Sequence, residues 1–158
     1  IAKIPELLEM GAVVSLAADG APCNNNLDIF QEMRSAALIQ KARLLSPTVM
    51  PAHQVFELAT LGGARAMGME KDLGSIEVGK KADMAIVNLN KLHCSPSKEV
   101  DVISQLVYSA QASDVETTLI DGKIVMENRK LTTLKEENIL KEANRLIAQQ
   151  LQLGNIKK

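Results

Sequence analysis

The fold is decided by one stretch of sequence, Ala12-Val13-Val14-Ser15-Leu16-Ala17-Ala18-Asp19-Gly20. Residues 12–18 are a nearly continuous apolar run of strand length, which is typical of a strand buried on both faces of a parallel sheet. Asp19 ends that run, and a polar loop follows it. Because α/β enzymes carry their chemistry at the carboxyl ends of parallel strands, Asp19 is the first candidate for a functional residue.

The polar loop also has ordinary structural explanations. Asp-Gly is a common turn sequence, and taken alone it favours a turn over a catalytic role for Asp19. Asn24 and Asn25 could orient a ligand, or they could cap the helix expected to begin near Leu27. Taken alone, these residues favour capping.

Helices are predicted on both sides of the strand. Residues 1–11 have the pattern of a helix end stopped by Gly11, and residues 27–43 have the apolar stripe of a long helix. A further helix is predicted from Pro51 to Gly68. A strand buried on both faces needs parallel neighbours, and this chain offers no second strand of that kind. Residues 1–68 are therefore expected to be a piece of a larger sheet structure.

The character of the sequence changes after residue 68. The expected strands cover 74–78 and 82–89, a hairpin joins 115–120 to 123–127 through Asp121-Gly122, and a helix covers 102–109. Thr133 and Glu136 have the spacing of a capping box, which predicts that a C-terminal helix begins there. We expect the β segments to form a small sheet and the last helix to cover it.

Composition excludes several classes of function. The 158 residues are too few for a complete (β/α)₈ barrel, which needs about 250. Eighteen basic and nineteen acidic residues give a net charge of −1 with no basic patch, so nucleic-acid binding is not expected. No apolar run is long enough to predict a membrane span. Cys23 and Cys94 lie far apart and predict no disulfide framework, so we expect a cytoplasmic protein.

The histidines give little support for a metal site. His53 is expected in the first turn of a helix, where solvation is its ordinary state. His93 and Cys94 are adjacent, and this spacing does not match the gaps of common zinc chelates. Neither histidine is predicted to bind a metal.

Four motifs in order resemble a known family. They are residues 19–34 (DGAPCNNNLDIFQEMR), 59–68 (ATLGGARAMG), 74–83 (GSIEVGKKAD), and 105–110 (QLVYSA) followed by 121–123 (DGK). Together they resemble the metal-dependent amidohydrolases, in the branch of the methylthioadenosine/S-adenosylhomocysteine deaminases and triazine hydrolases. The resemblance covers essentially the whole chain.

The resemblance implies an α/β fold made from the C-terminal part of a TIM (β/α)₈ barrel and part of a small β-sandwich domain. Residues 1–68 would be the end of the barrel, with its last strand at 12–18. Residues 69–130 would be the β-sandwich portion with an inserted helix near 102–109, and residues 131–158 the C-terminal helix. The family's metal-binding histidines have no counterpart in this sequence.

The resemblance also implies a chemistry. One divalent metal, Zn²⁺ or Fe²⁺, would be held in the complete parent protein, and the family's aspartate at the position of Asp19 contacts it and relays a proton. A bound metal lowers the pKa of water towards 7, and a neighbouring carboxylate can pass the proton to a leaving amine. Asn24 and Asn25 would bind substrate. This chain would hold one metal ligand and would be inactive alone.

The expected function is hydrolytic deamination of a purine-like or related heterocyclic amine by the parent enzyme. There are three alternatives to a deaminase: a triazine chlorohydrolase, another amidohydrolase, and a non-catalytic truncated remnant. The expected partners are the small-molecule substrate and either the missing N-terminal part of the barrel or another copy of the chain, because bare apolar strand edges associate. A homo-oligomer is therefore expected.

Overall fold

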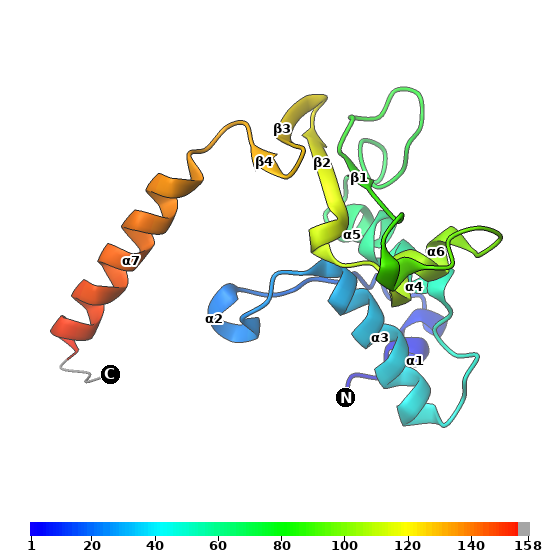
Figure 1. Cartoon of the computed structure of the whole chain (residues 1–158). Coiled ribbons are helices and arrows are strands. Elements are labelled where there is room, and N and C mark those ends of the chain that lie inside the picture. The colour runs from blue at the N-terminus through cyan, green and yellow to red at the C-terminus, as the bar shows by residue number, and fades with distance from the viewer. Residues whose placement is uncertain (155–158) are drawn as a thin grey trace.

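The computed structural model describes residues 1–154, and its elements fall into a helical group, a small sheet and a separate C-terminal helix (Figure 1). The helices are α1 (Ile4–Glu9), α2 (Ala21–Asn24), α3 (Ile29–Leu44), α4 (Ala52–Ala59), α5 (Leu61–Ala66), α6 (Val102–Tyr108) and α7 (Glu136–Leu153). Two short 3₁₀ helices are η1 (Leu92–Cys94) and η2 (Ala112–Asp114), and the strands are β1 (Met84–Val87), β2 (Val115–Ile120), β3 (Lys123–Glu127) and β4 (Lys130–Leu131).

The hydrophobic core lies where α3, α4 and α6 meet. Its buried members are mostly aliphatic, with one aromatic ring: Phe30, Met33, Ala37, Met50, Ala52, Val55, Leu58, Val107 and Ala110. The helices predicted over 27–43, from Pro51 and over 102–109 are confirmed to within a few residues. The single helix predicted from Pro51 to Gly68 is divided at Thr60 into α4 and α5.

The four strands form one antiparallel sheet in the order β1-β2-β3-β4. Met84 pairs with Leu119, and Met126 pairs with Leu131. The predicted hairpin is confirmed, and Asp121 and Gly122 both have positive φ (50° and 75°), as a two-residue turn of that kind requires. The short strand β4 was not predicted.

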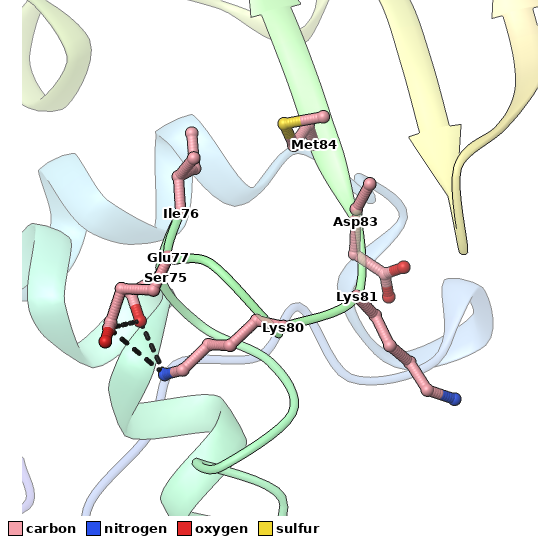
Figure 2. Close-up of a pocket in the computed structure, with 8 residues that line it drawn as sticks. Ser75, Ile76, Glu77, Lys80, Lys81, Asp83 and Met84 are labelled. Atoms are coloured by element: carbon pink, nitrogen blue, oxygen red, sulfur yellow. Dashed lines mark hydrogen bonds and ion pairs between the residues drawn. The ribbon is translucent and has the colours of Figure 1, made fainter.

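The strand predicted over 74–78 is wrong, because this segment wraps around a lysine instead. Lys80 Nζ donates a hydrogen bond to the Glu70 carbonyl at 2.7 Å. It also donates to Ser75 Oγ at 2.6 Å and lies 3.3 Å from a Glu77 carboxylate oxygen (Figure 2). These contacts hold the backbone in successive turns, and Ile76 remains 85% exposed.

The strand predicted over 12–18 is also absent from the described chain. The physical reason is that a strand needs a neighbour for its hydrogen-bond ladder, and here only the Leu16 N–H finds a backbone acceptor across the fold, the Leu58 carbonyl at 3.2 Å. The segment lies against Gly62, where an added Cβ would come within 2.9 Å of the Val14 carbonyl oxygen. Val13 is 61% exposed.

The expectation that the C-terminal helix covers the sheet is wrong. Helix α7 has no buried residue and stands apart from the sheet (Figure 1). The predicted capping box does not form, since Lys135 is the N-cap and Glu136 Oε1 accepts the Leu131 N–H at 3.2 Å. Residues 155–158 of the predicted helix lie outside the described residues. None of the described helices is long and apolar enough to cross a membrane.

One buried carboxylate joins the helical group to the sheet. Asp28 is 7% exposed and is the N-cap of α3, where its Oδ1 accepts the Phe30 N–H at 2.9 Å. Its Oδ2 accepts the Ala112 N–H of η2 at 3.0 Å, across 84 residues of sequence. Because η2 leads directly into β2, this carboxylate fixes the start of the sheet against the start of α3.

The substitution Asp28→Asn tests this connection. The two N–H groups are accepted by different oxygens of the Asp28 carboxylate, and an amide replaces one of these oxygens with an NH₂ that would face a backbone donor. We expect the free energy of unfolding to fall by about 1–3 kcal/mol, the cost of an unsatisfied buried donor. Chemical denaturation of the chain measures it. Asp72→Asn, at an exposed turn position, is the matched control and should change stability by less than about 0.5 kcal/mol; equal effects of the two would contradict the assignment.

Candidate functional site

Asp19 lies at the end of the apolar segment, in a left-handed backbone conformation with φ of 59°. Its side chain is exposed, and its Oδ1 accepts the N–H of Gly20 at 2.7 Å. This local bond is the usual Asp-Gly turn, so the turn interpretation describes the observed geometry. The carboxylate nevertheless faces solvent and is available to a ligand.

Asn24 and Asn25 have different positions on the loop after Asp19. Asn24 Nδ2 donates to the Ala18 carbonyl at 2.8 Å and to Glu32 Oε1 at 2.7 Å, so it ties the loop to the apolar segment and to α3. Asn25 is exposed and ends α2 in the left-handed conformation, with its N–H donating to the Ala21 carbonyl at 2.9 Å. The expectation that the asparagines cap the next helix is wrong, because Asp28 is the cap.

Asp19 and Asn24 therefore flank one short loop, connected through the backbone of Ala18. Among residues 1–154, the one group of at least three His, Cys, Asp or Glu side chains that converge at ligand distance does not include Asp19. A catalytic zinc site uses about three protein ligands. The described residues thus place a single carboxylate at Asp19 and do not form a metal site there by themselves.

Two hollows accompany these elements, and neither is lined by Asp19. One, of about 220 Å³, lies beside residues 11–14 and is bounded on its other side by Leu58, Gly62 and Arg65. The other, of about 110 Å³, lies between the turns around Lys80 and the start of β1 (Figure 2). The first hollow shows that the apolar segment leaves open space against α4 and α5.

The group that does converge consists of His93, Cys94 and Asp114. His93 Nε2 lies 2.8 Å from Asp114 Oδ2, and the three ligand atoms all lie within 4.8 Å of one another. The adjacency of His93 and Cys94 suggested no chelate, and sequence spacing could not reveal this group because Asp114 comes from η2, twenty-one residues away. Asp114 and Asp28 are the two buried carboxylates that sequence reasoning missed. The preference of Asp for helix N-caps was the signal for Asp28.

Burial shifts the ionisation of this group. The pKa of the Cys94 thiol is raised, first by burial and then by the negative charge of Asp114. Burial also acts to raise the pKa of Asp114. The His93 and Gln111 hydrogen bonds, with the positive charges of His93 and Lys91, more than offset it, so the pKa of Asp114 lies below its ordinary value. Asp114 is therefore a carboxylate at neutral pH, and Cys94 is a thiol in the absence of a cation.

Comparisons with known proteins agree with the motifs. The chain is 49% identical over 143 residues to the 5-methylthioadenosine/S-adenosylhomocysteine deaminase of Syntrophomonas wolfei, a match covering 90% of this chain and 33% of that protein. The structure of an adenosine deaminase from Xanthomonas campestris with bound zinc superposes with a TM-score of 0.85 at 36% identity, over 90% of this chain and 32% of that one. An atrazine chlorohydrolase from Arthrobacter aurescens, complexed with zinc, superposes with a TM-score of 0.82 at 25% identity, over 93% and 32% of the two chains.

Two facts follow from these matches. The chain spans about a third of the length of the relatives it matches. The profile of the amidohydrolase family matches residues 1–125, which is most of the chain. This α/β chain, with its four-stranded antiparallel sheet, belongs to the amidohydrolase family.

Proposed function

We propose that this chain works as part of a metal-dependent amidohydrolase that hydrolytically deaminates a purine-like amine. The 49% identity to a methylthioadenosine/S-adenosylhomocysteine deaminase, over nine-tenths of this chain, carries the proposal. In such a reaction water adds to the ring carbon that bears the amino group, and ammonia leaves. The rest of the complete protein would supply the other metal ligands, since the described residues supply only Asp19.

Asp19 is the residue to which we assign the chemistry. Its carboxylate stands exposed at the end of the apolar segment, with only a backbone N–H of the next residue bound to it. A divalent metal, when bound, would supply Lewis-acid chemistry, and zinc is present in two structures that superpose on this chain. Asp19 would contact the metal, take a proton and give it to the departing amine. Zinc or iron would serve this role.

The arrangement of the chain in the complete protein is part of the proposal. Residues 12–18 would be the last strand of a (β/α)₈ barrel, residues 69–130 part of a β-sandwich domain, and residues 131–158 a C-terminal helix. The open backbone and the 61% exposure of Val13 support this, because a strand edge without neighbours is suited to receive them. In this arrangement Asp19 would stand at the mouth of the barrel. Asn24 would hold the loop in place, and exposed Asn25 would face the substrate.

A second candidate is a chlorohydrolase of the triazine type. The observation that favours it is the superposition on atrazine chlorohydrolase at a TM-score of 0.82. The lower identity of 25%, against 36% for the adenosine deaminase, places the deaminase first.

The substitution Asp19→Asn in the complete enzyme tests the role of the carboxylate. Asparagine tolerates the left-handed backbone and keeps the turn, but it cannot hold the proton. We expect the rate of ammonia release from methylthioadenosine to fall by at least about 100-fold. Asp121→Asn is the matched control. Like Asp19, Asp121 is exposed, has a positive φ (50°) and is followed by a glycine. The control should retain full activity. Retained activity in Asp19→Asn would overturn the assignment.

The isolated chain offers a complementary measurement. With zinc or iron added, we expect it to release no ammonia from adenosine, methylthioadenosine or S-adenosylhomocysteine, because one carboxylate does not make a catalytic metal site. Turnover that depends on the metal and disappears in Asp19→Asn would show that the chain completes the site by itself.

Self-association is the third expectation. The unpaired backbone of residues 12–18 should pair with a second copy when the rest of a barrel is absent. Light scattering should then show mass rising with concentration. Val13→Lys should weaken association by about tenfold or more, because the charge would be buried in the contact. Val78→Lys, at a fully exposed turn position, is the control. A monomer at all concentrations would contradict this expectation.

A further inference from the structure

A cluster of three different ligand types lies away from the Asp19 loop. It is formed by His93 and Cys94 of η1 and by Asp114 of η2. Cys94 is 3% exposed and Asp114 is 2% exposed, whereas the His93 side chain is 39% exposed. One nitrogen, one sulfur and one carboxylate oxygen therefore converge at the edge of the folded body, with the imidazole on the solvent side.

We propose that His93, Cys94 and Asp114 bind one divalent cation of the zinc class, in a site separate from Asp19. A thiolate and a carboxylate together carry two negative charges, which balance the charge of the ion. Imidazole, thiolate and carboxylate are all ordinary zinc ligands, and three protein ligands leave a fourth position to water. The exposed imidazole provides the entry path that a metal site needs.

Binding requires the ligand atoms to move closer together. The three ligand atoms lie within 4.8 Å of one another. In a tetrahedral site zinc holds sulfur at about 2.3 Å and nitrogen at about 2.1 Å, which places two such ligand atoms roughly 3.6 Å apart. Any pair of the three ligand atoms that lies farther apart than this must close as the ion enters. The His93 Nε2 to Asp114 Oδ2 contact of 2.8 Å must open, because the ion replaces the hydrogen bond between them.

The surrounding structure fixes the ligands before any ion arrives. Buried Gln105 donates from Nε2 to the carbonyl of Cys94 at 2.8 Å and to that of Pro96 at 2.9 Å, which holds the η1 backbone. Asp114 Oδ2 accepts the Gln111 N–H at 3.0 Å, and the Asp114 carbonyl accepts the Asn88 N–H at 2.8 Å. Outer hydrogen bonds of this kind orient metal ligands and support affinity.

Two groups oppose binding and set its strength. Lys91 places a positive charge near Asp114, where it helps to lower the pKa of that carboxyl. The raised pKa of the Cys94 thiol means that a proton must leave when the cation enters. Because the site has one thiolate, we expect it to bind the cation more weakly than a site of several thiolates.

Cobalt(II) is the probe, because a thiolate bound to it gives an intense near-ultraviolet charge-transfer absorption. We expect the full chain, reduced and free of metal, to develop this band up to one equivalent of Co²⁺ and to lose it when zinc is added. Cys94→Ser should abolish the band, and Cys23→Ser, the other cysteine of the chain, should keep it. His93→Gln, an exposed position chosen to preserve the fold, should weaken cobalt affinity by about tenfold or more.

The variant Asp19→Asn should leave the band unchanged, so this experiment is independent of the proposed deaminase site. The proposal is overturned if no band forms with the wild-type chain, if Cys94→Ser keeps it, or if Cys23→Ser removes it. An unchanged affinity in His93→Gln would also overturn it, since the cysteine would then bind without the imidazole. Circular dichroism of each variant confirms that the helices are retained.

Discussion

The two hydrogen bonds accepted by the buried carboxylate of Asp28 are the connection on which the arrangement of this chain depends. One bond begins α3, and the other holds η2, so a single side chain sets both the first residue of the longest core helix and the entry to β2. From η2 the connection continues through Asp114, whose carbonyl accepts the Asn88 N–H beyond β1. Buried acceptors at the junction therefore join the helical group to the sheet, where apolar contact alone would fix neither register nor angle.

The N-terminal segment shows the opposite situation: residues 12–18 have the sequence of a buried strand but form no strand. Residues 12–18 are apolar enough for a central strand, yet a strand is stabilised by its neighbours and the described chain provides none for it. The chain belongs to the amidohydrolase family and spans about a third of the length of its relatives. These two facts support the proposal that residues 12–18 pair with strands of the complete protein. Asp19 and the loop held by Asn24 lie at the end of the segment, so the role proposed for Asp19 depends on the same neighbouring strands.

Local signals predicted the structure well wherever the determining contacts are local. The hairpin at Asp121-Gly122 and the helices α3, α4 and α6 follow from turn chemistry and from apolar spacing. The strand expected over 74–78 failed because Lys80, a residue of the following turn, organises the backbone around its ammonium group. The cluster around Asp114 was missed because its members are adjacent only in the fold. At the Asp19 loop, the role of the aspartate stays a prediction, and the partners of Asn24 could not be read from sequence because they lie on Ala18 and Glu32.

Gly62 has a bearing on how this family member tolerates mutation. A methyl group at this position would meet the Val14 carbonyl oxygen at 2.9 Å and the Glu57 carbonyl oxygen at 3.2 Å, and neither backbone atom can turn aside as a flexible side chain would. Even alanine would push residue 14 outward, and Asp19 lies only five residues further along the same strand-like path. A substitution at this helical glycine, which is not part of the proposed site, would thus displace a carboxylate that it does not contact.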